Sequence, residues 1–198
     1  NAAIAAFYDV YERDTADVEM IRALLAGRGA LRVFEAFCGT GRILLPLALD
    51  GHDVVGYDQS GVMLARCWDK VAALPAATRQ RVTLIEEDAV AGQWPGGFDV
   101  VLLAGNWAYE LATPEEQEAC IAAAARALKP GGFLLSDCDH QEGALAESWQ
   151  VVEDRHPGWP NGTLPDGTRL SGWSRTLWFD AAQRLIRFHR GVTVTFSD

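Results

Sequence analysis

The chain has 198 residues, 49% of them hydrophobic and 22% charged, which predicts one globular domain with a sizeable core. The formal net charge of −10 argues against nucleic acid as a partner, because phosphate binding requires a basic surface. No apolar run approaches the roughly 20 residues of a membrane span, and the first residues lack the basic lead of a signal peptide. We therefore expect a cytoplasmic protein with no membrane partner.

Four cysteines occur, and none forms the C-x-x-C pair of a zinc or redox site. We expect reduced thiols and no metal: Cys38, Cys67, Cys120 and Cys138. The first residue is not Met, so we expect that the natural start is missing.

Strand and helix signals alternate along the first 140 residues. Short apolar runs, typical of strands, occupy residues 31–37, 53–58, 81–88, 98–105 and 133–140. Helical spacing is found over residues 41–51, 60–74 and 113–132. Pro46 is expected in a first turn or at an early kink.

Two of these helices carry recognisable start signals. Ser60 is a candidate N-cap, because its hydroxyl can accept from the first free backbone N–H groups. Thr113, Pro114 and Glu116 form a capping box with proline at the first helical position. The Lys-Pro-Gly sequence that begins at Lys129 is expected to end the helix that starts after Thr113.

The alternation predicts an α/β fold, namely a doubly wound, mainly parallel sheet with helices on both faces. Ligands in such sheets bind at the carboxyl ends of the strands. A glycine or polar residue follows each of the five predicted strands: Gly39, Asp58, Asp88, Asn106 and the segment 137–140. Such residues at every strand end favour a ligand site at this edge.

The last part of the chain has a different pattern. Residues 166–180 and 183–196 are rich in β-branched and aromatic residues, which predicts an antiparallel hairpin or small sheet. Residues 156–167 contain three prolines and three glycines, and we expect a loop there. Trp173 and Trp178 are five apart, so in a regular strand they point to opposite faces unless a bulge intervenes.

The glycine turn after the first strand limits the choice of nucleotide. A dinucleotide-binding turn has glycine at a third position, where this chain has Leu44, and no Walker phosphate-binding loop is present. The stretch "EAFCGTG", from Glu35 to Gly41, instead resembles the first motif of class I S-adenosylmethionine-dependent methyltransferases, with Phe37 in place of the first glycine.

Further motifs strengthen this resemblance. Asp58 ends the second strand, Asp88 follows the third, and "LKPGG" (128–132) precedes the fifth. The resemblance covers roughly residues 7–140 and is closest to the small-molecule enzymes of the class. It implies a Rossmann-like methyltransferase core over 1–140. Residues 141–198 are then an antiparallel β insertion that covers the acceptor site.

The resemblance also implies roles for individual residues. Asp58 is expected to accept from the ribose hydroxyls, Asp88 from the adenine amino group, and Glu35 to lie near the methionine amino group or to orient the loop. Gly39 and Gly41 allow the backbone to approach the cofactor. The full implied set for S-adenosylmethionine is Tyr8, Glu35, Phe37, Gly39, Gly41, Asp58, Gln59, Asp88, Ala89, Gly105 and Asn106.

The acceptor side is less determined by the sequence. Trp107, Tyr109 and His140 are candidate acceptor-binding residues, and Tyr109 and His140 are the candidate catalytic ones. Trp107 and Tyr109 can equally form an apolar wall. The carboxylates near residue 137 have the donor type of a magnesium site, although we expect no metal. The segment around Tyr8 and Tyr11 is either a lid over the cofactor or an ordinary packed helix.

Several alternatives remain open at this point. The chain could be a catalytically silent cofactor-binding or partner protein, or a nicotinamide-dependent oxidoreductase, which Leu44 disfavours. The methyl acceptor, the methylated atom and the oligomeric state, a homodimer included, are not determined. The family sheet has seven strands, and the sequence leaves no room for the last two unless the chain is truncated or the tail strands substitute for them.

Overall fold

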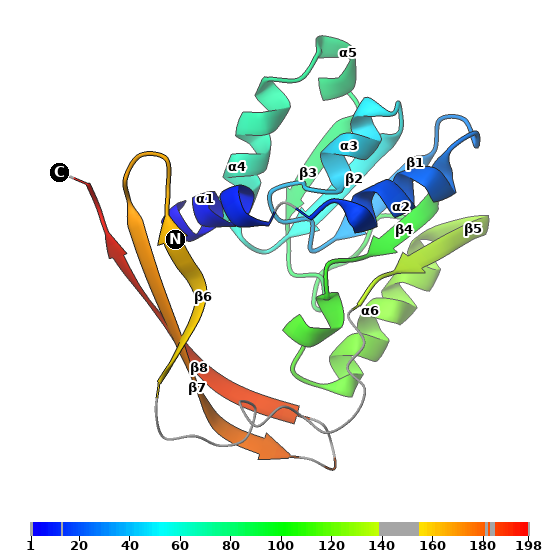
Figure 1. The fold of residues 1–198 in the computed structure, drawn as a ribbon. Coiled ribbons are helices and arrows are strands. Elements are labelled where there is room, and N and C mark those ends of the chain that lie inside the picture. The colour runs from blue at the N-terminus through cyan, green and yellow to red at the C-terminus, as the bar shows by residue number, and fades with distance from the viewer. Residues whose placement is uncertain (1, 13, 139–154, 181, 183–184, 198) are drawn as a thin grey trace. The chain divides into compact units, whose positions relative to one another are not determined.

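A computed structural model describes residues 2–12, 14–138, 155–180, 182 and 185–197 (Figure 1). Contacts divide the chain into two compact units. Residues 14–139 form the parallel-sheet unit, and residues 1–13 together with 140–198 form the antiparallel-sheet unit. Residues 1–13 thus cluster with the C-terminal part of the chain, whereas the sequence analysis grouped them with residues 14–140.

The parallel-sheet unit contains five strands in the order β3-β2-β1-β4-β5, all paired in parallel. They are β1 (Arg32–Ala36), β2 (Asp53–Asp58), β3 (Val82–Glu86), β4 (Phe98–Leu103) and β5 (Leu128–Ser136). Side chains alternate between two buried clusters, as the period of two requires; Val33 faces one cluster and Phe34 the other. The expected α/β architecture with a doubly wound parallel sheet is confirmed.

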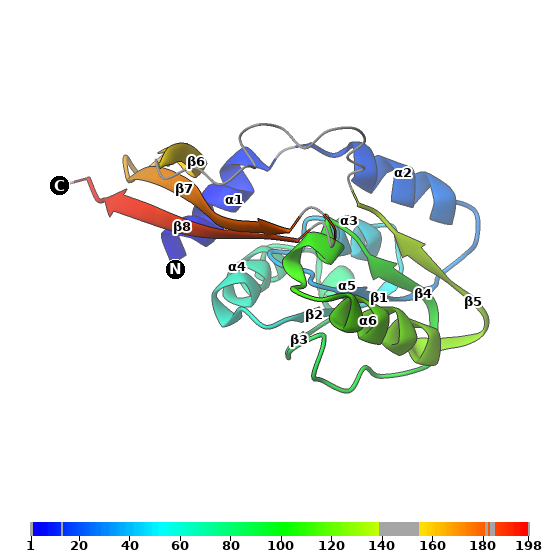
Figure 2. The same cartoon turned by 90° about the horizontal axis from the view of Figure 1, so that it is seen from below.

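Helices cover both faces of this sheet (Figure 2). They are α2 (Ala16–Leu25), α3 (Leu44–Leu49), α4 (Gly61–Ala72), α5 (Ala76–Arg79), the 3-10 helix η1 (Trp107–Glu110) and α6 (Pro114–Ala127). One core cluster is built from α2, α3 and α4, and the other from α6 and η1. Within the described residues no helix is long and apolar enough to span a membrane.

The predicted start signals are confirmed. The Ser60 hydroxyl accepts from the Met63 N–H at the start of α4. At α6, Thr113 Oγ1 accepts from the Glu116 N–H, and the Glu116 carboxylate accepts from the Thr113 N–H. Pro46 lies in the first turn of α3, where proline is tolerated.

The end of α6 differs from the prediction. The helix ends at Ala127, and β5 begins directly at Leu128 rather than at Phe133. The pairing of β5 with β4 is irregular in this first part, between Phe98 and Val100. Gly132 allows the close approach, because a Cβ there would lie 2.9 Å from the carbonyl oxygen of Phe98. The Lys-Pro-Gly-Gly segment therefore belongs to the strand, at its irregular start.

The antiparallel-sheet unit contains helix α1 (Ala2–Tyr11) and strands β6 (His156–Thr163), β7 (Arg169–Asp180) and β8 (Leu185–Thr195), in the order β6-β7-β8. The predicted antiparallel hairpin is confirmed as β7 and β8. These three strands form a sheet of their own, so among the described strands β5 remains an edge of the parallel sheet. Phe7 of α1 packs with Leu164 and Leu170 in the core of this unit.

The prediction of a loop over 156–167 is wrong for its first eight residues. Residues 156–163 form β6, which pairs with β7 at an edge of the sheet, with a register shift between Gly158 and Asn161. Proline is tolerated at sheet edges and bulges, where its missing N–H breaks no ladder bond. The composition that predicted a loop therefore also fits a bulged edge strand.

A bulge in β7 also decides where the two tryptophans point. Trp173 pairs with Gly191 and Trp178 with Arg187, and the register shifts between Thr176 and Trp178. One extra residue reverses the alternation of faces beyond it. Trp173 and Trp178 therefore share a face of the hairpin. A regular strand would have placed them on opposite faces, and the bulge is the exception allowed for in the prediction.

Candidate functional site

The strand order brings four turns together at the carboxyl edge of the parallel sheet. The strands β3, β2, β1 and β4 are neighbours in that order, so the turns that follow them lie side by side. These turns contain the glycine motif and most of the predicted cofactor residues. The site is therefore described from these turns outward.

The turn after β1 has an unusual backbone. Phe37 has φ +61°, Gly39 +54° and Gly41 +81°. A positive φ is costly for a bulky side chain such as Phe, and residues held in this way are concentrated at functional sites. The only other described non-glycine residue with positive φ is Asn106, in the turn after β4. Both strained residues therefore follow neighbouring strands at this edge.

The two glycines of the turn are required for different reasons. A Cβ on Gly39 would meet only the end of the Met63 side chain, at 3.5 Å, so the space beside Gly39 is open. A Cβ on Gly41 would lie 2.6 Å from Cys67 Sγ and 2.9 Å from Leu45. Gly41 thus serves the packing of the turn against α3 and α4, whereas Gly39 leaves an accessible backbone.

Asp58 joins two turns of the site. One carboxylate oxygen accepts from the Gly39 N–H at 2.9 Å, and the other accepts from the Ser60 N–H at 2.8 Å. Each carboxylate oxygen has a second lone pair, so Asp58 can still accept from a ligand hydroxyl. The residue therefore positions the glycine turn whether or not a ligand is present.

Glu35 is the buried carboxyl group of the site. Only 4% of the residue is exposed, and its Oε2 atom is buried with no hydrogen-bond partner. Burial is the main cause that raises the pKa of Glu35 to about 8. The negative charges of Asp17 and Asp58 raise this pKa further, and the positive charge of Arg42 partly offsets the rise. An orphaned buried acceptor is costly, so a donor or cation that reached Oε2 would relieve this cost.

A bidentate ion pair braces this region from α2. The Arg42 guanidinium donates to both carboxylate oxygens of Asp17, at 2.7 and 2.6 Å, and to the Asp14 carbonyl at 2.9 Å. Arg42 holds the pKa of Asp17 below its usual value. The sequence does not predict this pair, because 25 residues separate its members; its one local signal is the arginine directly after "GTG".

Asp88 organises the turn after β3. Its Oδ1 atom accepts from the N–H groups of Val90, at 2.7 Å, and Ala91, at 3.3 Å. Ala89 is buried, and its carbonyl accepts from the Trp94 indole at 2.9 Å. The turn is thus fixed by its own side chains, with the Asp88 residue exposed at the surface.

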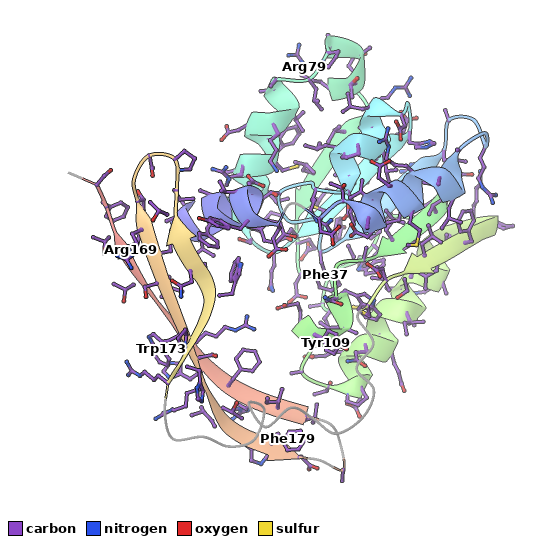
Figure 3. The ribbon with its side chains drawn as sticks, in the orientation of Figure 1. Phe37, Arg79, Tyr109, Arg169, Trp173 and Phe179 are labelled. Atoms are coloured by element: carbon purple, nitrogen blue, oxygen red, sulfur yellow. The ribbon has the colours of Figure 1, made fainter. Side chains whose placement is uncertain are left out.

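The residues after β4 fall into two groups (Figure 3). Trp107 is 5% exposed, belongs to the α6 side of the core, and donates its indole N–H to Ser136 Oγ at 3.0 Å. Tyr109, labelled on η1 in Figure 3, is 55% exposed. Gly105 has φ +68° and open space at its Cβ position, so the backbone beside Asn106 is accessible.

Three remaining predicted residues are placed as follows. Gln59 is exposed directly after Asp58. Tyr8 lies on α1, in the antiparallel-sheet unit. His140 lies outside the described residues. Among the described residues no group of three or more His, Cys, Asp or Glu side chains could hold a metal ion.

The edge fits S-adenosylmethionine on three observations. Gly39 and Gly105 leave open backbone where a Cβ would stand, Asp58 retains acceptor capacity for hydroxyl groups, and Glu35 has one carboxyl oxygen without a partner. A cationic amino group is the natural partner of a buried carboxylate. The donor and acceptor types match an adenosine linked to a cationic amino acid.

Comparison with known proteins gives the same result. The profile of a family described as a methyltransferase domain matches residues 33–132. The putative methyltransferase YqeM of Bacillus subtilis is 32% identical over 129 residues, which are 64% of this chain and 49% of that protein. Malonyl-[acyl-carrier protein] O-methyltransferase of Salmonella typhimurium is 27% identical over 191 residues, which are 89% of this chain and 70% of that protein.

A solved structure shares the fold. The glycopeptide N-methyltransferase MtfA, complexed with S-adenosyl-L-methionine, matches with a TM-score of 0.57 and 21% identity. The match covers 89% of this chain and 75% of that one. By contrast, the chain spans about half the length of the Bacillus relative.

Proposed function

Because the chain belongs to the class I S-adenosylmethionine-dependent methyltransferases, we propose that it transfers the methyl group of that cofactor to a small-molecule acceptor. The observation that carries the proposal is the turn after β1. Its backbone is strained at Phe37, open at Gly39 and held by Asp58, and it lies beside a buried acid, Glu35, whose Oε2 atom has no hydrogen-bond partner.

The cofactor would be held by the four turns. Asp58 accepts from ribose hydroxyls with its remaining lone pairs, and Asp88 accepts from the adenine amino group. Glu35 faces the cationic amino group, which lowers the cost of its buried charge. The Gly39 backbone lies against the cofactor, and Phe37, Gln59, Ala89, Gly105 and Asn106 complete the proposed contacts. Gly41 supports the turn from within the core.

When bound, the cofactor supplies an electrophilic methyl group on a positively charged sulfur. The chain then has to orient the acceptor in line with the bond that breaks, and such positioning can supply roughly 7–11 kcal/mol of barrier lowering. The fixed turns serve this purpose, because Asp58 and Asp88 restrain the backbone before any ligand binds. A general base is needed only if the acceptor is protonated at the working pH.

We place the acceptor beside Tyr109. Its exposed hydroxyl and ring can bind or orient the acceptor, and His140 is retained as a candidate base. Trp107 is proposed as the support of this wall rather than as a contact, since its indole is buried and bonded to Ser136. Tyr8 is retained as a candidate contact to the cofactor.

Calorimetry tests the cofactor half of the proposal. S-adenosylmethionine or its demethylated product should bind in the micromolar range, and NAD should show no comparable binding. Binding of NAD alone would overturn the assignment. Binding of the cofactor without turnover on any acceptor of a broad amine, hydroxyl and carboxylate panel would favour a catalytically silent binding protein.

A pair of substitutions tests the acceptor half. Tyr109→Ala should raise the acceptor's Michaelis constant and leave the affinity for the demethylated cofactor unchanged. Trp107→Ala should instead destabilise the fold, by about 3–5 kcal/mol, because it empties a packed core position. The reverse pattern, with a folded Trp107→Ala enzyme that loses acceptor binding, would move the acceptor site to Trp107.

A further inference from the structure

A hollow lies within the antiparallel-sheet unit, between the end of α1 and strand β6. It has a volume of about 460 Å³ and is lined by Phe7, Tyr11, Glu12, Pro157, Gly158, Trp159 and Asn161. None of these residues belongs to the proposed cofactor set. We propose that this hollow binds an organic cation, namely a protonated or methylated amine group of a small molecule.

The aromatic rings of the hollow form a corner. The rings of Phe7 and Tyr11 stack with centroids 4.0 Å apart and an interplanar angle of 14°. Trp159 meets Phe7 edge-on, at 5.8 Å and 82°. The planes of Tyr11 and Trp159 are therefore close to perpendicular. Tyr11 and Trp159 both line the hollow, and the face of either ring can attract a cation that comes within about 6 Å of its centroid.

The Tyr11 ring is fixed before any ligand binds. Its hydroxyl donates to the Thr163 carbonyl and accepts from the Thr163 N–H, both at 3.2 Å. Gly162 makes this possible, because a Cβ there would lie 2.4 Å from the Tyr11 oxygen. Since the hydroxyl is bonded to the backbone, the ring face is the part of Tyr11 that remains for a ligand.

Exposure and charge indicate what the corner binds. Trp159 is 41% exposed and Tyr11 is 45% exposed, so both large rings face solvent. The exposed carboxylate of Glu12 lines the same hollow, and no ion pair to it is formed within the described part of the chain. The guanidinium of Arg155, the residue before β6, is stacked on Trp173 at 4.0 Å from the ring centroid. Aromatic faces with one carboxylate select a cation over an anion.

This inference goes beyond the proposed function, because the hollow belongs to the antiparallel-sheet unit and the turns proposed for the cofactor belong to the parallel-sheet unit. The binding itself does not require methyl transfer, so it can be measured separately. A loss of cation binding leaves the cofactor assignment untouched, and a failure of cofactor binding leaves the hollow testable.

Choline and its neutral analogue 3,3-dimethyl-1-butanol are the probes. The alcohol has a carbon atom where choline has its quaternary nitrogen, so the two differ in charge and have the same shape. The full chain is titrated with each and followed by NMR at the indole N–H of Trp159, which is assigned by its loss in Trp159→Ala. Choline should bind roughly 3- to 30-fold more tightly than the alcohol, the range expected for a cation on aromatic faces.

Matched variants localise the effect. Trp159→Ala should abolish the preference for choline, and Glu12→Gln, at an exposed position, should weaken choline binding roughly two- to fivefold without changing the fold. Trp178→Ala, at an exposed tryptophan of β7 outside the hollow, should leave choline binding unchanged. For this variant and for Glu12→Gln, binding is followed at the Trp159 signal. For Trp159→Ala, which lacks that signal, binding of choline and of the alcohol is followed by saturation-transfer NMR at the methyl signal of each ligand.

Three outcomes would overturn the proposal. The first is equal binding of choline and the alcohol. The second is choline binding that Glu12→Gln and Trp159→Ala leave unchanged. The third is displacement of choline by saturating S-adenosylhomocysteine, which would assign the hollow to the cofactor.

Discussion

Asp58 is the residue on which two turns of the site depend. It accepts from the N–H groups of Gly39 and Ser60, so its removal acts on the backbone as well as on a ligand. A variant at Asp58 alone therefore cannot distinguish a role in ordering the turn from a role in binding ribose. Comparing ligands with and without a ribose hydroxyl can distinguish them.

We expect Asp58→Ala to weaken S-adenosylhomocysteine binding roughly 10- to 150-fold, because hydrogen bonds to a charged group contribute about 1.5–3 kcal/mol. Calorimetry with the cofactor product and its 2′-deoxy analogue checks the cause. Wild type should prefer the ribose form and Asp58→Ala should lose that preference. Asp53→Ala, at an exposed carboxylate at the other end of β2, is the control. A preference that survives in Asp58→Ala would leave Asp58 with the turn-ordering role only.

Glu35 predicts a pH dependence of stability. Its pKa rises from 4.5 in the unfolded chain to about 8 in the folded one, so the folded state holds the proton more tightly. Below pH 4.5 the group is protonated in both states and has no effect. As the pH rises from 4.5 to 8, the unfolded state gains from ionisation and the folded state becomes relatively less stable.

Glu35→Gln should therefore be more stable than wild type at pH 8, by up to roughly 4–5 kcal/mol, and equal to it near pH 4.5. Urea unfolding at a series of pH values measures this difference. The amide keeps the volume of the side chain and an oxygen that can accept from the Leu44 backbone. A difference that does not change between pH 4.5 and 8 would contradict the raised pKa that burial gives Glu35.

At the scale of the elements, local signals were most reliable where one side chain satisfies one free backbone group. The capping box of α6 is such a case, because Thr113 and Glu116 are three residues apart and need no tertiary partner. The predicted start of α6 was correct. The predicted end was wrong, because the pairing of Leu128 with Phe98 in the neighbouring strand turned the chain into β5.

The capping box gives a prediction for α6. Thr113→Ala removes the acceptor for the Glu116 N–H and should lower the free energy of unfolding by about 1 kcal/mol. Thr113→Ser retains a hydroxyl at the same position and should recover most of the loss. Thermal unfolding of the two variants provides the comparison, and equal losses for Ala and Ser would exclude the cap as the cause.

At the scale of the whole molecule, ligand binding should stabilise the parallel-sheet unit through its turns. S-adenosylhomocysteine at 100 times its dissociation constant should raise the free energy of unfolding by about 2.7 kcal/mol. Hydrogen exchange should show the protection first at residues 37–41, 58–60 and 88–91. Residues 75–81, at the opposite edge of the sheet, serve as the reference. Equal protection of both edges would indicate a global effect rather than a site at the carboxyl ends.

The sequence by itself determined the parallel sheet, the helix starts and the glycine turn. Each rests on a local cause: an apolar run long enough for a buried strand, a hydroxyl before a helix, or a glycine where φ is positive. The motif also identified the cofactor class, because Glu35, Gly39 and Asp58 occur in order along consecutive elements.

Only the tertiary structure decided the features that depend on partners distant in the chain. The proline-rich segment became strand β6 because β7 supplied an edge that tolerates proline and a bulge. The bulge between Thr176 and Trp178 placed Trp173 and Trp178 on the same face of the hairpin. A Cβ on Gly41 would collide with Cys67, which is distant in the sequence, and Arg42 pairs with Asp17, 25 residues away. Such pairings follow from packing in space, which no local pattern of residues specifies.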